Sequence, residues 1–374
     1  MTKPCCHNKA DILSIQGLYC KIESSYYMKY VSCYYYLPLL ILKSWVVFIY
    51  AITISVESIL IEFLTTTFLQ IPPIMLSATS IILAGIMLLL IATFFMRKKG
   101  MTTLFSKSWK NLILACFLLA VGVFTWYDSI SRIGASKEVL IAGPLEIVVI
   151  VVLARIFLNE KLDRIQVIGI VLALIGFFMA VTSDADNIRG NSIYPIIWPS
   201  QSTIITFGDI EAIVSAFGFA IGVLFLTKLV SVHSSIEVAG ASMLVSGLIL
   251  FGFMIGFLRE SVLELSSYEK PSFRQHPLII TIIILIIFSL FPFIGSLCYS
   301  TGLSRIGASI TATIGSSSIL MTVLIQIMLK ELGIKSNLPE NIFLAILGGV
   351  LGFLGIYIIH MHDHYLSIST SRKQ

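Results

Sequence analysis

Charged residues are scarce in this chain. Only 12% of its 374 residues are Asp, Glu, Lys or Arg, and 57% are hydrophobic, whereas a soluble domain carries about 25% charged residues. So few charges cannot cover the surface of a water-soluble protein of this length. The composition therefore excludes a soluble domain and indicates an integral membrane protein.

Several motifs that carry chemistry are also missing. The sequence has no GxxxxGK[ST] phosphate loop, no HExxH, no GxSxG and no basic, aromatic-rich region suited to nucleic acid. The alternating histidines of HMHDH favour a solvated tail over a metal site. We therefore expect no cofactor, no metal and no nucleic-acid partner. No CxxC pair occurs among the six cysteines: Cys5, Cys6, Cys20, Cys33, Cys116 and Cys298.

Long apolar runs dominate what is present. Charged or Pro/Gly-bearing breaks separate ten of them, and most approach the about 20 residues that a helix needs to cross a bilayer. A membrane barrel would instead show alternating strands of about ten residues. The sequence predicts an all-α integral membrane protein with ten transmembrane helices, at residues 39–60, 74–96, 112–130, 139–158, 165–181, 210–230, 236–258, 278–302, 306–329 and 342–360.

The hexapeptide SRIGAS occurs at residues 131–136 and again at 304–309. The first copy opens the fourth predicted helix and the second opens the ninth, so the repeated unit contains five helices. A seven-residue glycine spacing recurs in the fifth and tenth helices: Gly169 and Gly176, then Gly348 and Gly355. Because five is odd, two consecutive copies must cross the bilayer in opposite directions. The sequence therefore predicts two inverted five-helix repeats.

Basic residues predict the orientation. In the first half, most Lys and Arg residues, including those of MRKKG and KSWK, fall on the same side as the N-terminus, and such segments stay in the cytoplasm. We expect a multi-pass protein of the cell membrane with both termini cytoplasmic. Its predicted parts are an N-terminal cytoplasmic tail (1–38), a first repeat (39–182), an extracytoplasmic linker (183–206), a second repeat (207–361) and a C-terminal cytoplasmic tail (362–374).

The stretch SRIGASKEVLIAGPLEIVVIVVLARIFLNEKLDRIQVIGIVLALIGFFMAV resembles the end of the first half of an EamA-type member of the drug/metabolite transporter superfamily. GDIEAIVSAFGFAIGVLFLTK is similar to the sixth helix of that family. The likeness covers about residues 39–359 and implies the same fold and a transport function. The chain departs from the family pattern at Ser316–Ser318, where Pro is frequent, at the added acid Glu146, and in the long polar loop 259–277.

Charges within the predicted helices are informative, because each costs about 2.5–3.5 kcal/mol at a helix centre. Glu146 lies eight residues into the fourth helix, two residues after Pro144. We expect it either to face a wet cavity, in substrate binding or proton coupling, or to be a neutral or paired structural acid. Glu57 is a borderline case. Other charges lie near predicted ends, where side chains reach the membrane surface: Lys43, Asp128, Arg155, Asp209, Lys228 and Glu237.

Aromatic and hydroxyl side chains are further candidates for a solute site. Trp126, Tyr127 and Tyr299 lie near the ends of the third and eighth helices, where they either line the cavity or form an interfacial belt. The serines of the GSSS stretch in the ninth helix either bind substrate or bond back to their own helix. The predicted substrate-binding residues are Glu146, Trp126, Tyr127, Tyr299 and Ser317.

Two function classes fit these features. The repeat and the resemblance favour a secondary active transporter or exporter that moves a small organic metabolite by alternating access. The alternative is an intramembrane enzyme or a receptor-like protein. An enzyme needs a tight set of His, Asp or Cys, and here the ionisable residues within the helices are few and scattered. We therefore expect no catalytic residues, and a small-molecule substrate, with protons as candidate coupling ions.

The orientation is tested at the turn that bears Asn159. A cysteine introduced there, in a chain without its native cysteines, should resist an impermeant thiol reagent applied outside intact cells, because the surrounding basic residues hold this turn in the cytoplasm. A cysteine at Asn191, in the predicted extracytoplasmic linker, is the control that should react. Ready labelling at Asn159 would invert the predicted topology.

Overall fold

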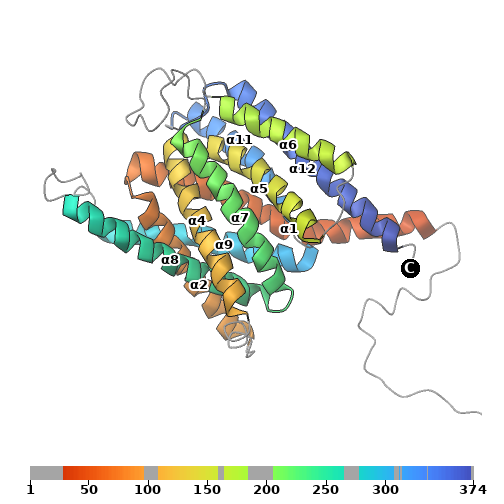
Figure 1. The fold of residues 1–374 in the computed structure, drawn as a ribbon, viewed down its shortest axis with the longest axis horizontal. Helices are drawn as coiled ribbons and strands as arrows, with labels where there is room; N and C mark the ends of the chain where they lie inside the picture. The colour runs from red at the N-terminus through yellow and green to blue at the C-terminus, as the bar shows by residue number, and fades with distance from the viewer. Residues whose placement is uncertain are drawn as a thin grey trace, which may run out of the picture. The chain divides into compact units, whose positions relative to one another are not determined.

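The computed structural model describes residues 28–96, 108–158, 164–183, 205–264, 278–306, 311, 314–334 and 336–371. The chain divides into the units Met1–Lys43 and Ser44–Gln374, and the contacts below lie in the second. Among the described residues every regular element is a helix. In chain order they are α1 (Met28–Glu62), the π-helix η2 (Phe63–Phe68), α2 (Pro73–Met96), α4 (Trp109–Ile133), α5 (Ala135–Leu158), α6 (Arg164–Thr182), α7 (Phe207–Val230), α8 (Ser235–Glu264), α9 (Leu278–Ile306), α11 (Ser317–Glu331) and α12 (Ile342–Ser371) (Figure 1).

Many of these helices are long and apolar enough to cross a membrane. The described residues contain eight such segments. The helix α5 matches most of the predicted fourth span, and α11 covers the second half of the predicted ninth span, part of whose first half lies outside the described residues. The eight are Trp45–Phe68, Pro73–Phe94, Trp109–Ile133, Arg164–Thr182, Phe207–Val230, Ser235–Gly256, Ile279–Arg305 and Ile342–Ile359.

Apolar side chains lie on the outside of the bundle, and polar ones are buried within it. Phe94 and Phe343 are each 77% exposed, whereas Glu57, Glu138 and Asp209 are almost fully buried. A helical bundle in lipid needs this distribution, because hydrocarbon solvates apolar groups and leaves polar groups unsatisfied. The exposed aromatic side chains are therefore suited to contact lipid.

The two halves of the chain share their cores. One buried cluster combines residues of α5 and α6 with residues of α7, α11 and α12. A second cluster combines α1, α2 and α4 with α8 and α9. Each core therefore draws on both halves, and neither half buries its apolar surface by itself.

Glycines bring α6 and α12 into backbone contact. A Cβ at Gly169 would lie 2.7 Å from the carbonyl oxygen of Gly355, and one at Gly348 would lie 2.8 Å from that of Gly176. The residue that comes first in α6 thus meets the residue that comes last in α12, so the two helices run antiparallel, side by side (Figure 1). Small residues allow this approach in a membrane, where close packing drives helix association.

The helices α2 and α8 make a similar contact. A Cβ at Gly85 would meet the backbone of Leu244, and one at Gly247 would meet Ile82. The order of these contacts again makes the pair antiparallel. Because Gly85 and Gly247 lie on different helices and each faces the other helix, neither position accepts a larger side chain without moving backbone.

The helix α7 packs closely through its small residues. Its Gly218 faces Gly122 of α4, while Ala212, Ala216 and Ala220, four residues apart, are completely buried. The three alanines belong to the cluster that includes α5. The helix α7 is therefore held between α4 and α5 by surfaces with short side chains.

Several helix boundaries differ from the sequence prediction. The helix α5 begins at Ala135, directly after Gly134, whose φ of 85° ends α4. Lys137 and Glu138, which the sequence prediction left in an outer loop, are therefore helical and buried. The predicted start at 139 rested on the apolar pattern alone. That pattern leaves out charged residues, even those that partners elsewhere in the fold allow to be buried.

The helices α1 and α12 extend into the predicted terminal tails. The helix α1 begins at Met28, before the predicted start at residue 39, and α12 continues to Ser371. Neither extension contains glycine, the residue most often found where a helix stops. The predicted linker 183–206, apart from its two ends, the turn 159–161 and most of the loop 259–277 lie outside the described residues.

Substituting Gly176 by Ala should lower the melting temperature of the purified protein by several degrees. The new Cβ would collide with the backbone of Gly348 and Gly352, and overpacking costs about 1–3 kcal/mol. Thermal unfolding in detergent measures the effect. The control is Gly252→Ala, because a Cβ there meets nothing within 4 Å. Equal melting temperatures for the two variants would contradict the α6–α12 contact.

Candidate functional site

A cavity of about 250 Å³ lies among the helices of the unit Ser44–Gln374. Its lining comes from α1, α2, α4 and α5 in the first half and from α7, α8, α9 and the region of α11 in the second. Along the bundle it extends from Glu138, near the start of α5, to Leu226, near the end of α7. Both halves therefore contribute walls to the same cavity.

Three carboxylates line this cavity: Glu57 on α1, and Glu138 and Glu146 on α5. The Tyr127 hydroxyl donates to Glu57 Oε1 at 3.0 Å, and Trp126 Nε1 donates to Glu138 Oε2 at 3.0 Å. Glu146 has no hydrogen-bond or ion-pair partner among the described residues. Since a carboxylate away from water needs a donor or a proton, Glu146 can accept either one from outside the protein.

Aromatic rings form two groups on the cavity wall. The rings of Tyr50 and Tyr299 lie 4.9 Å apart between centroids, tilted by 46°. Trp126 packs edge to face against Phe219, with centroids 6.0 Å apart. All four residues line the cavity. The wall therefore offers faces on which a flat or cationic group can stack.

The structure brings three of the five predicted site residues to the cavity. Glu146, Trp126 and Tyr299 are among its lining residues. Tyr127 and Ser317 are not among the residues that line it. Tyr127 is completely buried behind Glu57, and Trp126 is only 8% exposed, so neither forms an interfacial belt. Tyr127 is thus placed to orient Glu57 rather than to touch a solute.

The serines that precede and begin α11 divide between two roles. The Ser317 hydroxyl donates to the carbonyl of Ile314 at 2.7 Å, so it bonds back to its own segment. Its neighbours Ser316 and Ser318 line the cavity. The Ser55 hydroxyl of α1 lies 3.1 Å from the Ser318 carbonyl. This hydrogen bond ties α1 to the start of α11 beside the cavity wall.

A buried polar cluster around Glu62 lies at the end of the cavity where α5 starts. The Glu62 carboxylate accepts hydrogen bonds from the Ala135 amide at 2.8 Å, from the Asn337 amide at 2.6 Å and from the Gln326 side chain. Gln326 Oε1 in turn accepts from the backbone and hydroxyl of Ser136. One carboxylate thus joins α1, the start of α5, α11 and the segment before α12.

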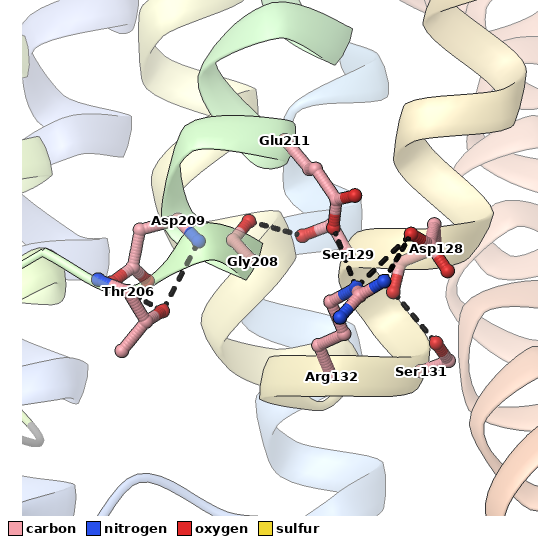
Figure 2. Close-up of polar contacts among 8 residues, drawn as sticks. All are labelled: Asp128, Ser129, Ser131, Arg132, Thr206, Gly208, Asp209 and Glu211. Atoms are coloured by element: carbon pink, nitrogen blue, oxygen red, sulfur yellow. Dashed lines mark hydrogen bonds and ion pairs between the residues drawn. The ribbon is translucent and has the colours of Figure 1, made fainter. Parts of the chain in front are cut away.

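A buried ion pair holds α5 against α7. Lys137 Nζ lies 3.0 Å from Asp209 Oδ1, and their side chains are 2% and 0% exposed. Asp209 also caps its own helix: Oδ2 accepts from the Thr206 amide at 2.7 Å, while the Asp209 amide donates to the Thr206 hydroxyl (Figure 2). Asp209 therefore lies inside the protein, whereas the sequence analysis placed it at the membrane surface.

The end of α4 is joined to the start of α7 beside this pair. Figure 2 shows Arg132 between two carboxylates, 3.0 Å from Asp128 Oδ2 and 3.1 Å from Glu211 Oε2. The Ser129 hydroxyl donates to the Gly208 carbonyl at 2.9 Å. The Arg132 side chain is 47% exposed, so these ion pairs are screened by solvent and contribute little to the stability of the fold.

Sequence reasoning missed several residues at the cavity and at its end. Glu138 and Lys137 were missed because the helix start was placed four residues late. Glu62 was missed because it follows the predicted end of the first helix, and Tyr50 because aromatic residues are common in apolar spans. The usable signal for Glu62 was its position as the second acid in SVESILIE, five residues after Glu57.

The chain resembles solved structures and the model of one protein family. One solved structure, described only as "Crystal structure of protein", matches with a TM-score of 0.52 at 15% identity, over 87% of this chain and 97% of its own. It is among 25 solved chains that match, and at this identity it supports the fold alone. No curated protein matches. The model of the EamA-like transporter family matches residues 41–182 and 206–361, and the chain therefore belongs to that family.

Proposed function

We propose that the protein is a secondary active transporter that moves a small organic solute by alternating access through the 250 Å³ cavity. The observation that carries this proposal is the shared lining: helices of both EamA-like segments contribute walls to one cavity. A site between two repeats is the arrangement from which rocking of one repeat against the other exposes a solute to each membrane side in turn.

An inverted repeat of ten membrane helices is part of this proposal. The antiparallel pairs α2–α8 and α6–α12 support it, because each joins the corresponding helices of the two halves. The contacts are also reciprocal, since Gly169 meets Gly355 while Gly176 meets Gly348. A two-fold axis produces such exchanged contacts. An axis that reverses helix direction lies in the membrane plane.

In this mechanism, the Glu62 cluster is the gate that opens and closes the end of the cavity where α5 starts. Glu62 follows Glu57 by five residues, about 7.5 Å along a helix, so the cluster lies just beyond the cavity. The π-helix η2 begins at the next residue, and Gln70 behind it has a φ of 49°. Irregular helix and left-handed backbone often mark moving parts. By the charge bias of the first half, this gate faces the cell exterior and the cavity faces the cytoplasm.

Transport fits the cavity better than catalysis does. Glu57 and Glu138 are each fixed by an aromatic donor, whereas Glu146 lacks a described partner. A carboxylate of this kind can exchange a proton or a solute donor between the two access states. Glu146 is therefore assigned to solute binding or proton coupling.

Replacing Glu146 by Gln should reduce solute uptake into proteoliposomes by about ten-fold or more, or abolish its dependence on pH between about 5 and 8. Gln keeps the shape of the side chain and removes its charge, and intramembrane carboxylates mark substrate and proton pathways. Uptake is measured with a panel of amino acids, nucleosides, sugars and amines. Thermal unfolding of the variant shows that the fold is retained.

The matched control for this experiment is Val148→Ala. Val148 lies two residues further along α5, is 7% exposed, and is not among the cavity-lining residues. Its variant should transport at close to the normal rate. Normal, pH-dependent uptake by Glu146→Gln would make Glu146 a structural acid.

A further inference from the structure

The described lining of the cavity contains acidic side chains and no basic ones. Glu57, Glu138 and Glu146 line it, and the described lining residues include no Lys, Arg or His. Glu138 and Glu146 are eight residues apart on α5, which places them about 12 Å apart along the axis and on similar faces. The acidic groups are thus distributed along the cavity rather than gathered at one point.

The basic residues next to the cavity are engaged elsewhere. Lys137 precedes Glu138 in the chain, yet its ammonium pairs with Asp209. Arg132 pairs with Asp128 and Glu211. The donors that do reach the cavity acids, from Trp126 and Tyr127, are neutral. The donors described for Glu57 and Glu138 are therefore neutral, while the ion pairs described for Lys137 and Arg132 go to Asp209, Asp128 and Glu211.

The remaining wall suits an apolar body with a positive charge. Tyr50 and Tyr299 present one ring pair, and Trp126 and Phe219 another. Aromatic faces attract ammonium groups as well as apolar groups. A volume of about 250 Å³ lies just below the range of about 300–1,000 Å³ of small-molecule pockets, which favours a small solute.

We propose that the cavity selects a small organic cation, a protonated amine or a quaternary ammonium, whose charge lies among the three carboxylates and whose apolar part contacts the aromatic side chains. This inference rests on the proposed function, because it names the solute class of the same cavity. An anionic solute is disfavoured by like-charge repulsion wherever these acids are ionised. A neutral solute leaves protons alone to balance them.

The test uses the purified full-length protein at fixed pH with four probes. Three are phenyl compounds of similar size that differ in charge, and the fourth is choline. Two are cations, 2-phenylethylamine and choline; 2-phenylethanol is the neutral analogue and 3-phenylpropionate the anion. A ligand that binds the folded state raises its melting temperature as its concentration increases. We expect stabilisation by 2-phenylethylamine, the better match to the aromatic wall, and by choline, and none by the neutral or anionic probe.

Variants assign the effect to the cavity. Glu146→Gln should weaken the apparent affinity for 2-phenylethylamine about ten-fold or more, the loss expected for a charge-assisted hydrogen bond, while Val148→Ala leaves it within about two-fold. Glu57→Gln serves as a second variant if Glu146→Gln does not fold. Stabilisation by the neutral or anionic probe alone, by none of the four, or by cations regardless of both Glu variants would overturn the inference.

Transport of the same probes separates this inference from the proposed function. Cation binding without uptake into proteoliposomes would keep the inference and contradict transport. Uptake of neutral or anionic solutes, without cation binding, would keep transport and contradict the inference.

Discussion

The buried carboxylate of Glu62 joins the two halves of the chain at the end of the cavity where α5 starts. A carboxylate removed from water is costly unless donors replace its hydration. Here the donors come from the start of α5, from Gln326 and from the Asn337 amide. Those groups belong to both halves of the chain, so they satisfy Glu62 together only while the two halves meet at this end. In the proposed mechanism, opening that end exposes Glu62 to water, and water replaces the protein donors.

Small residues and the buried Lys137–Asp209 pair surround the Glu62 cluster. The glycine contacts of α6 with α12 and of α2 with α8 keep the halves at backbone distance, while the Lys137–Asp209 pair attaches the start of α5 to α7. These features resist separation of the helices but present few interlocking side chains. In our account the halves therefore rock against each other at smooth contacts, and the polar clusters determine which end is closed.

Much of the fold followed from the sequence, because lipid imposes strong rules. Apolar length predicted the helices, the SRIGAS repeat and glycine spacing predicted a duplicated unit, and the resemblance to EamA-type transporters is confirmed by the family match. The cost of burying a charge singled out Glu146, which does line the cavity. Tyr127, Ser317 and Lys137 could not be placed in this way, because one turn of helix decides whether a side chain meets the cavity, its own backbone or a partner from the other half.

The most direct test measures, in the Glu62→Gln variant, the distance across the end of the bundle where α5 starts. Spin labels at Thr67 and Leu332, both exposed, report the distance across that end by pulsed electron resonance, in a chain without its native cysteines. Gln has one acceptor oxygen for three donors, so the account predicts that a longer distance becomes populated in the variant and is rare in the unmodified protein. Identical distance distributions in both proteins would contradict it and reduce the Glu62 cluster to a static support.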